Sequence, residues 1–328
     1  MPEAIETTWA GGAFGLALRS EFALPGLKEV DARDEAGGVG GPGGGDARSL
    51  ALELGPTATP SPDADWGERV QEWRYPNGTI GLAIDSDPKR GYRFYVEDGT
   101  FELTPDGRWA TAHPAPNSAW RWRRYLTGQV LPFAALLQGL EVFHASAVEI
   151  DGSAVALLGG SGVGKSTLAL NLHLAGAGFV TDDVIAVERS GSTVVVHPGI
   201  PAAKVRQAAR ELIGPDPRGA LGEPASEDDF ELRFRVEGPA GPLPLGVVCL
   251  LEPSAGDAEI EFAEERADPW RLLGNTFNLI VQDSERLNAQ LDLCAQIASQ
   301  AHCLRVRVPS RPGPEAAAGL AARLWKLP

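Results

Sequence analysis

A glycine-rich segment near the middle of the chain constrains its fold and function more than any other feature. Residues 155–158 are apolar, residues 159–167 read GGSGVGKST, and an apolar helical pattern follows through Leu168 and Leu172. This is the G-x-x-x-x-G-K-S pattern of a P-loop, between a buried strand and a helix as it requires. Glycines let backbone N–H groups curl around a polyphosphate, and the helix N-terminus adds partial positive charge beneath it. The segment therefore predicts a nucleotide site.

Each residue of this loop is a candidate contact with the nucleotide. The predicted binding set is Gly159, Gly160, Ser161, Gly162, Val163, Gly164, Lys165, Ser166 and Thr167. Lys165 is expected to reach the β- and γ-phosphate oxygens, and the hydroxyl of Ser166 is expected to ligate Mg²⁺. The predicted cofactors are ATP and Mg²⁺.

Composition argues against two classes of partner. The chain carries 29 Lys and Arg against 44 Asp and Glu, a net charge of −15. Such a surface repels phosphate backbones and anionic lipid, so neither nucleic acid nor a membrane is an expected partner. The N-terminal residues lack a secretory signal pattern and no run of 18 apolar residues occurs, so a cytoplasmic location is expected. Cys249 lies in the apolar run 247–251 and is expected to be a buried structural thiol.

Turn signals and periodicity divide the chain into parts. Residues 1–117 are expected to form a mostly β domain with a disordered glycine-rich loop near residues 37–46. Residues 118–141 follow a helical pattern, interrupted at Pro132, and are expected to be a helical connector. Residues 142–328 are expected to form the P-loop domain.

The P-loop domain is expected to be of the α/β class with a mixed sheet. Strand and helix patterns alternate, and Asp151-Gly152 predicts a hairpin between residues 143–150 and 153–158. A helix is expected at residues 203–212.

Asp182 and Asp183 are the second candidate element of the site. They follow a short apolar strand, and Asp182 comes 17 residues after Lys165. If that strand lies beside the P-loop strand and parallel to it, both carboxylates face the γ-phosphate. Asp183 would then hold the metal and Asp182 would accept the proton of an attacking hydroxyl, although the two roles could be exchanged. Nearby cations are expected to lower the pKa of both carboxylates.

Three short runs resemble the catalytic domain of HPr kinase/phosphorylase, and more distantly the nucleotide site of phosphoenolpyruvate carboxykinase. They are FHASA at residues 143–147, the P-loop at 159–167, and TDD at 181–183. The resemblance implies an HPr kinase C-terminal-domain-like fold and places the family's roles on His144, Asp182 and Asp183. The expected catalytic residues are therefore Asp182, His144 and the P-loop lysine, Lys165. The turn PGIP at residues 198–201 and the N-terminal stretch with LRS at 18–20 resemble HPr kinase-related proteins of peptide natural-product clusters of the lasso peptide type.

The resemblance implies a Mg-ATP-dependent kinase that phosphorylates a hydroxyl, with serine of a peptide or protein as the expected acceptor. Residues 1–141 do not resemble the N-terminal domain of HPr kinases, and the second signature of that family is not found, so HPr itself is not the expected acceptor. A kinase for a small hydroxylated metabolite is the alternative within enzymes, and a P-loop ATPase or GTPase switch is the alternative outside them. No Asn-Lys-x-Asp motif for guanine occurs. A homo-oligomeric assembly is left open.

Three further residues are lesser candidates. Lys204 and Arg206 follow the PGIP turn and would either stabilise transferring phosphate or be surface cations. Glu252 ends an apolar strand as a metal-binding acid of a P-loop protein would, and it ranks below Asp183.

Overall fold

The computed structural model describes residues 8–29, 48–63, 65–206, 221, 224–227, 231–254, 260–277, 280–281, 283–309 and 314–326. The glycine-rich loop expected near residues 37–46 lies outside these ranges. The chain divides into two compact units, residues 1–140 and 141–328. Within the described residues, no helix is long and apolar enough to cross a membrane.

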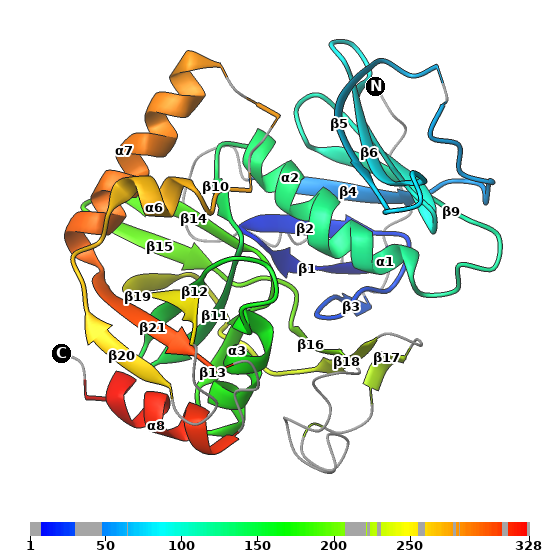
Figure 1. Cartoon of the computed structure of the whole chain (residues 1–328). Helices are drawn as coiled ribbons and strands as arrows, with labels where there is room; N and C mark the ends of the chain where they lie inside the picture. The colour runs from blue at the N-terminus through cyan, green and yellow to red at the C-terminus, as the bar shows by residue number, and fades with distance from the viewer. Residues whose placement is uncertain are drawn as a thin grey trace. The chain divides into compact units, whose positions relative to one another are not determined.

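The first unit is built on one nine-stranded sheet, in the order β3-β1-β2-β4-β9-β8-β7-β6-β5 (Figure 1). Its strands are β1 Trp9–Ala13, β2 Leu16–Ser20, β3 Lys28–Glu29, β4 Ser49–Leu54, β5 Glu68–Arg74, β6 Ile80–Asp87, β7 Gly91–Val96, β8 Gly99–Leu103 and β9 Trp109–Pro114. Strands β5 to β9 form an antiparallel meander, whereas β4 pairs in parallel with both β2 and β9. The mostly β character expected for this part of the chain is confirmed.

The helical segment after β9 belongs to the first unit. It consists of α1 Trp122–Tyr125, a π-helix at Leu126–Val130 and α2 Leu131–Leu137. Pro132 falls in the first turn of α2, and the irregular π-turn directly precedes it, where the regular hydrogen-bond pattern of the helix is already interrupted. The segment expected as a separate connector is therefore part of the N-terminal unit, with the boundary at 140/141.

Aromatic side chains fix this segment against the sheet. The ring of Phe133 meets those of Tyr92 and Phe94 edge to face at 4.8 and 5.4 Å. Beyond the helix, the amide of Gln138 donates to the carbonyls of Ser49 and Gly107 at 3.0 and 2.7 Å. These contacts are internal to the unit, so the segment contributes to its core.

We expect Phe133→Ala to lower the free energy of unfolding of this unit by about 3–5 kcal/mol, because a buried ring is removed and a cavity remains. Six of the eight tryptophans lie in residues 1–140, so tryptophan fluorescence during urea unfolding reports mainly on this unit. Val70→Ala, at a partly exposed position of β5, is the control and should change stability by less than about 1 kcal/mol. An unchanged transition for Phe133→Ala would show that the segment does not stabilise the unit.

The second unit is a mixed α/β structure, as the sequence predicts. Its large sheet has the order β10-β14-β15-β19-β12-β11-β13, and β21 joins β19 to β20 at a branch. The strands of this sheet are β10 Glu141–Phe143, β11 Ala145–Ile150, β12 Ser153–Leu158, β13 Gly178–Thr181, β14 Ile185–Ser190, β15 Thr193–His197, β19 Leu243–Pro253, β20 Glu261–Glu264 and β21 His302–Val308. A three-stranded sheet, β16-β18-β17, contains β16 Ala202–Arg206, β17 Pro224–Glu227 and β18 Glu231–Arg235.

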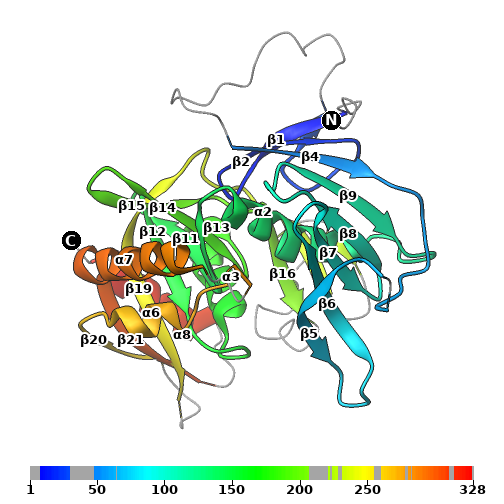
Figure 2. The ribbon, with the colours of Figure 1, turned by 90° about the horizontal axis from the view of Figure 1, so that it is seen from above.

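Helices cover both faces of the large sheet, seen from two directions in Figures 1 and 2. On one face, α3 (Lys165–Leu174) and α8 (Pro314–Leu324) enclose a core with Val155 and Leu157 of β12. On the other, α6 (Pro269–Leu273) and α7 (Ser284–Gln300) enclose a core with Ala154, Ala156 and Leu158. Because successive side chains of β12 enter opposite cores, its sequence is apolar from Ala154 to Leu158. Cys249 is fully buried in the first of these cores, as expected.

Candidate active site

The glycine-rich loop joins the end of β12 to the start of α3, in the context expected for a P-loop. Gly159 packs so closely against the next strand that a Cβ atom there would lie 2.8 Å from the carbonyl oxygen of Leu251. Gly164 precedes the first residue of α3 with φ 103°, a conformation that L-residues with side chains rarely adopt. Close packing therefore requires glycine at position 159, and the positive φ favours glycine at position 164, for reasons that the motif alone does not show.

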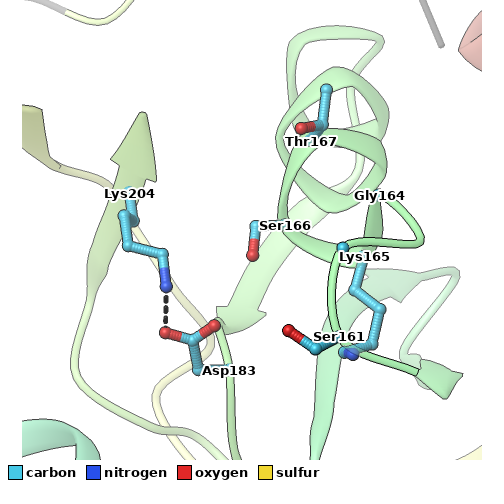
Figure 3. A pocket seen from close by; sticks show the side chains of 8 residues that line it. Ser161, Gly164, Lys165, Ser166, Thr167, Asp183 and Lys204 are labelled. Carbon is cyan, nitrogen blue, oxygen red and sulfur yellow. Dashed lines mark hydrogen bonds and ion pairs between the residues drawn. The ribbon is translucent and has the colours of Figure 1, made fainter. Parts of the chain in front are cut away.

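Residues of the loop and of α3 form one side of a pocket. The ammonium of Lys165 donates to the carbonyl oxygens of Gly159 and Gly160 at 2.6 and 3.1 Å, so the side chain lies along its own loop. Residues from two other elements complete the wall (Figure 3). The lining residues are Ser161, Gly162, Gly164, Lys165, Ser166, Thr167, Asp183 and Lys204.

Asp182 and Asp183 follow β13, but that strand is not the neighbour of β12. Strand β11 lies between them and pairs antiparallel with both. The condition that the two strands lie side by side is therefore not met. Since β12 and β13 both run antiparallel to β11, their carboxyl ends still meet at one edge of the sheet. The P-loop and the aspartate pair reach the same site because an antiparallel strand is inserted between them.

Strand β11 also contributes a residue that the sequence analysis missed. Ser146 is fully buried, and its hydroxyl donates to Oδ1 of Asp182 at 2.8 Å. The same carboxylate oxygen accepts the backbone N–H of Asp183 at 2.9 Å. The predicted hairpin places the start of β11 opposite the end of β12, where the P-loop begins. This register could have identified Ser146 as a residue near the site.

The surroundings of Asp182 raise the pKa of its carboxyl group. Burial is the largest cause and the negative charge of Asp183 adds to it, whereas Lys204 and hydrogen bonds with Ser166 and Ser146 act in the opposite direction. The protein's own groups thus do not lower the pKa of this carboxyl group as expected. Asp182 is linked through hydrogen bonds to both the P-loop and β11.

Asp183 faces the pocket in a left-handed backbone conformation, with φ 67°. Its Oδ2 atom accepts a charged hydrogen bond from the ammonium of Lys204. Lys204 comes from β16, where the sequence predicted a helix over residues 203–212; residues 202–206 form a strand instead. Pairing with Glu231–Arg235 of β18 stabilises this strand, and a local pattern could not foresee that partner. The side chain of Arg206 is not among the described ones.

His144 occupies the break between β10 and β11. Its backbone N–H donates to the carbonyl of Asn275 at 2.8 Å, and its ring lies 5.2 Å from that of Phe277. The protein around the imidazole and the charge of Lys165 lower its pKa, while Asp183 acts in the opposite direction. These influences show that His144 lies near the site, although it is not one of the residues lining the described pocket.

Glu252 is placed differently from the other candidates. Its carboxylate forms an ion pair with Arg271 of α6 at 2.8 Å, and it does not line the pocket. Its lower rank in the sequence analysis agrees with this position.

The oxygens around the pocket suit a magnesium ion that arrives with a nucleotide. Mg²⁺ prefers hydroxyl, carboxylate and phosphate oxygens and is usually held by one or two carboxylates together with substrate phosphates. Ser166 and Asp183 present such oxygens to the same pocket, and Asp182 is hydrogen-bonded to Ser166. Groups of three or more His, Cys, Asp or Glu side chains placed to hold a metal do not occur within the described ranges. The donor set therefore fits a phosphate-bound Mg²⁺ rather than an all-protein metal cage.

Comparison with known proteins identifies relatives of this part of the chain. Residues 137–205 match the HPr Serine kinase C-terminal domain family. The matched segment contains the P-loop, both aspartates, His144 and Lys204. An HPr kinase/phosphorylase of Pelodictyon phaeoclathratiforme is 44% identical over 55 residues, which are 17% of this chain and 17% of that protein. An HPr kinase/phosphorylase of Chlorobaculum tepidum is 47% identical over 51 residues, which are 16% and 15% of the two chains.

The similarity in sequence is confined to a small part of each protein. The alignments span less than a fifth of the length of these relatives. Among solved structures, the Hpr(Ser) kinase/phosphatase from Coxiella burnetii aligns with 56% of this chain and 96% of its own, with 16% identity and a TM-score of 0.28. A TM-score this low does not establish a shared fold. The relationship to the HPr kinase C-terminal domain therefore rests on the segment that carries the site.

Proposed function

We propose that this protein is a Mg-ATP-dependent kinase that transfers the γ-phosphate to a hydroxyl group. The observation that carries the proposal is one pocket in which Lys165, Ser166 and Asp183 meet, with the carboxylate of Asp182 accepting a hydrogen bond from the backbone N–H of Asp183. The match of residues 137–205 to the HPr Serine kinase C-terminal domain family supports the same chemistry. Nucleotide binding and phosphate transfer are one proposal, because a single site would serve both.

The chain's own residues would act on the phosphates and on the acceptor proton. The amides of the P-loop and the ammonium of Lys165 would hold the β- and γ-phosphates. Bound Mg²⁺ would neutralise charge on the phosphates, held by Ser166 and one carboxylate. The second carboxylate would accept the proton of the attacking hydroxyl. His144 would contact the acceptor or the phosphate from the start of β11.

Two observations bear on how the aspartates divide these tasks. The raised pKa of Asp182 supports its role as the base, since a carboxylate with a higher pKa binds a proton more readily. Its contact with Ser166, and the exposure of Asp183 to the pocket, support the exchanged arrangement. We propose Asp182 as the base and Asp183 as the metal ligand.

We further propose that the acceptor is a serine of a peptide or protein. The names of the matched relatives describe kinases of the protein HPr, and one of them names serine. The resemblance of residues 198–201 and 18–20 to proteins of peptide natural-product clusters supports a ribosomal peptide precursor. The decisive experiment incubates the protein with Mg²⁺, ATP and peptides encoded beside its gene, and measures the masses of the products. A gain of one phosphate on a peptide is expected; phosphorylation of small hydroxylated metabolites alone, or ATP hydrolysis alone, would contradict the peptide acceptor.

HPr itself is not expected to be a substrate. The family match covers residues 137–205, and the alignments with the relatives span less than a fifth of the relatives' length. We expect no phosphorylation of HPr and no release of pyrophosphate from phosphoserine-HPr with inorganic phosphate. An HPr kinase/phosphorylase assayed in parallel is the positive control. A rate comparable to that control in either direction would make this protein an HPr kinase in the narrow sense.

A further inference from the structure

Lys204 is a second cation of the pocket, and it comes from a separate sheet. In the described parts of the chain, Lys165 and Lys204 are the lysines that line the pocket. Figure 3 shows them on opposite sides, with Ser166 and Asp183 between them. Lys165 belongs to the first turn of α3, whereas Lys204 is the central residue of β16. The two lysines therefore lie on either side of Ser166 in the pocket.

The position of Lys204 is built into the fold. Its side chain is only 8% exposed, and a buried ammonium group is costly unless an anion compensates it. The neighbours Ala203 and Val205 are fully buried in the core that contains Leu168 of α3. Because this core fixes the strand beside the helix, the Lys204 side chain is held at the pocket wall. It is not the surface cation that the sequence also allowed.

Lys204 is paired with Asp183, the residue that is proposed above as the metal ligand. The ammonium is hydrogen-bonded to Oδ2 of Asp183, and it also influences Asp182 electrostatically. A divalent ion held by Asp183 would compete with the ammonium of Lys204 for this carboxylate. When the ion takes that carboxylate, the phosphates brought with it are the compensating anions that the pocket offers to Lys204.

We propose that Lys204 is a phosphate-contacting residue whose ammonium passes from Asp183 to the terminal phosphate when Mg-ATP binds. It would then stabilise the charge that develops on the transferred phosphoryl group, from the side opposite Lys165. This inference rests on the proposed function, because it assumes a nucleotide in the P-loop. It adds Lys204 of β16 to the residues of the P-loop and the aspartate pair that would act on the phosphates.

The test compares ATP with ADP, since only ATP has the terminal phosphate. We expect Lys204→Met to weaken ATP binding about 10- to 100-fold, the effect of losing a charge-assisted hydrogen bond, and to weaken ADP binding less than about threefold. Lys204→Arg keeps the charge and should retain most of the ATP affinity. Lys326→Met, at an exposed position of the C-terminal segment, removes the same charge elsewhere and should change neither. Because partial unfolding lowers both affinities equally, the ATP-to-ADP ratio remains informative even in a destabilised variant.

A double-mutant cycle separates direct contact from an effect through Asp183. ATP affinity is measured in the presence of saturating Mg²⁺ for Lys204→Met in the parent and in an Asp183→Asn background. We expect the Lys204→Met loss to persist in both. A loss that vanishes with Asp183→Asn, or equal losses for ATP and ADP, would make Lys204 only a partner of Asp183 and overturn the inference. If the parent binds ATP but phosphorylates no acceptor, the proposed kinase fails while these affinities still decide the role of Lys204. A parent that binds no ATP would overturn both.

Discussion

Replacing Asp182 with Asn is expected to abolish most phosphate transfer and to leave Mg-ATP binding nearly unchanged. The amide keeps the shape of the side chain, and its oxygen can still accept the hydrogen bonds from Ser146 and from the N–H of Asp183. What it loses is the capacity to accept a proton. General-base contributions are typically about 10²–10⁴ in rate, or roughly 3–5 kcal/mol of transition-state stabilisation. We therefore expect transfer to fall by that factor.

The neighbouring variant should behave differently. Asp183→Asn changes a group that faces the pocket, and it should lower the nucleotide affinity that depends on Mg²⁺ as well as the transfer rate. The measurements are nucleotide titrations with and without Mg²⁺, together with transfer rates. Glu252→Gln removes a nearby carboxylate that does not line the pocket, and it should leave both quantities at parental values.

The comparison of the two aspartate variants distinguishes the two assignments. If Asp182→Asn loses the Mg²⁺-dependent affinity and Asp183→Asn loses only transfer, the roles are exchanged. If Asp182→Asn transfers phosphate at nearly the parental rate, it is not the base. Ser146→Ala offers a finer check, because it removes one hydrogen bond to Asp182 and should cost about tenfold or less in transfer.

Lys165→Met is also expected to have a large effect, and it should lower both ATP affinity and the rate of phosphate transfer. The ammonium lies on the loop carbonyls of Gly159 and Gly160, within the same wall that would receive the phosphates. Removing a cation from a site filled with phosphate charge lowers the stability of both the bound ground state and the transition state. We expect ATP affinity to fall at least about tenfold and transfer by a further factor of about 10²–10³.

Calorimetric titration with ATP and a transfer assay would measure the two losses separately. Lys326→Met is again the control matched in charge and residue type, since that lysine is exposed in the C-terminal segment. Thermal denaturation would confirm that Lys165→Met is folded. ATP affinity equal to that of the parent would show that the nucleotide does not occupy the P-loop, and the proposed function would then lose its foundation.

The amino-acid sequence by itself determined the local features of this protein. The apolar run of β12, the glycine spacing and the helix after Lys165 are all properties of contiguous residues, and the structure has them as expected. The β11–β12 hairpin was equally predictable, because Asp151 and Gly152 adopt the positive φ values of 48° and 78° that a tight turn favours. The mixed α/β class followed from the same local patterns.

Tertiary structure alone decided which distant residues meet. Strand β11 enters between β12 and β13, and this order, invisible in local periodicity, brings Ser146 to Asp182. Residues 202–206 become a strand because β18, some 30 residues further along, supplies the hydrogen-bonding partner. That strand then carries Lys204 to Asp183, 21 residues earlier in the chain. Such contacts depend on long-range pairing and packing, which override the local preferences on which sequence patterns rest.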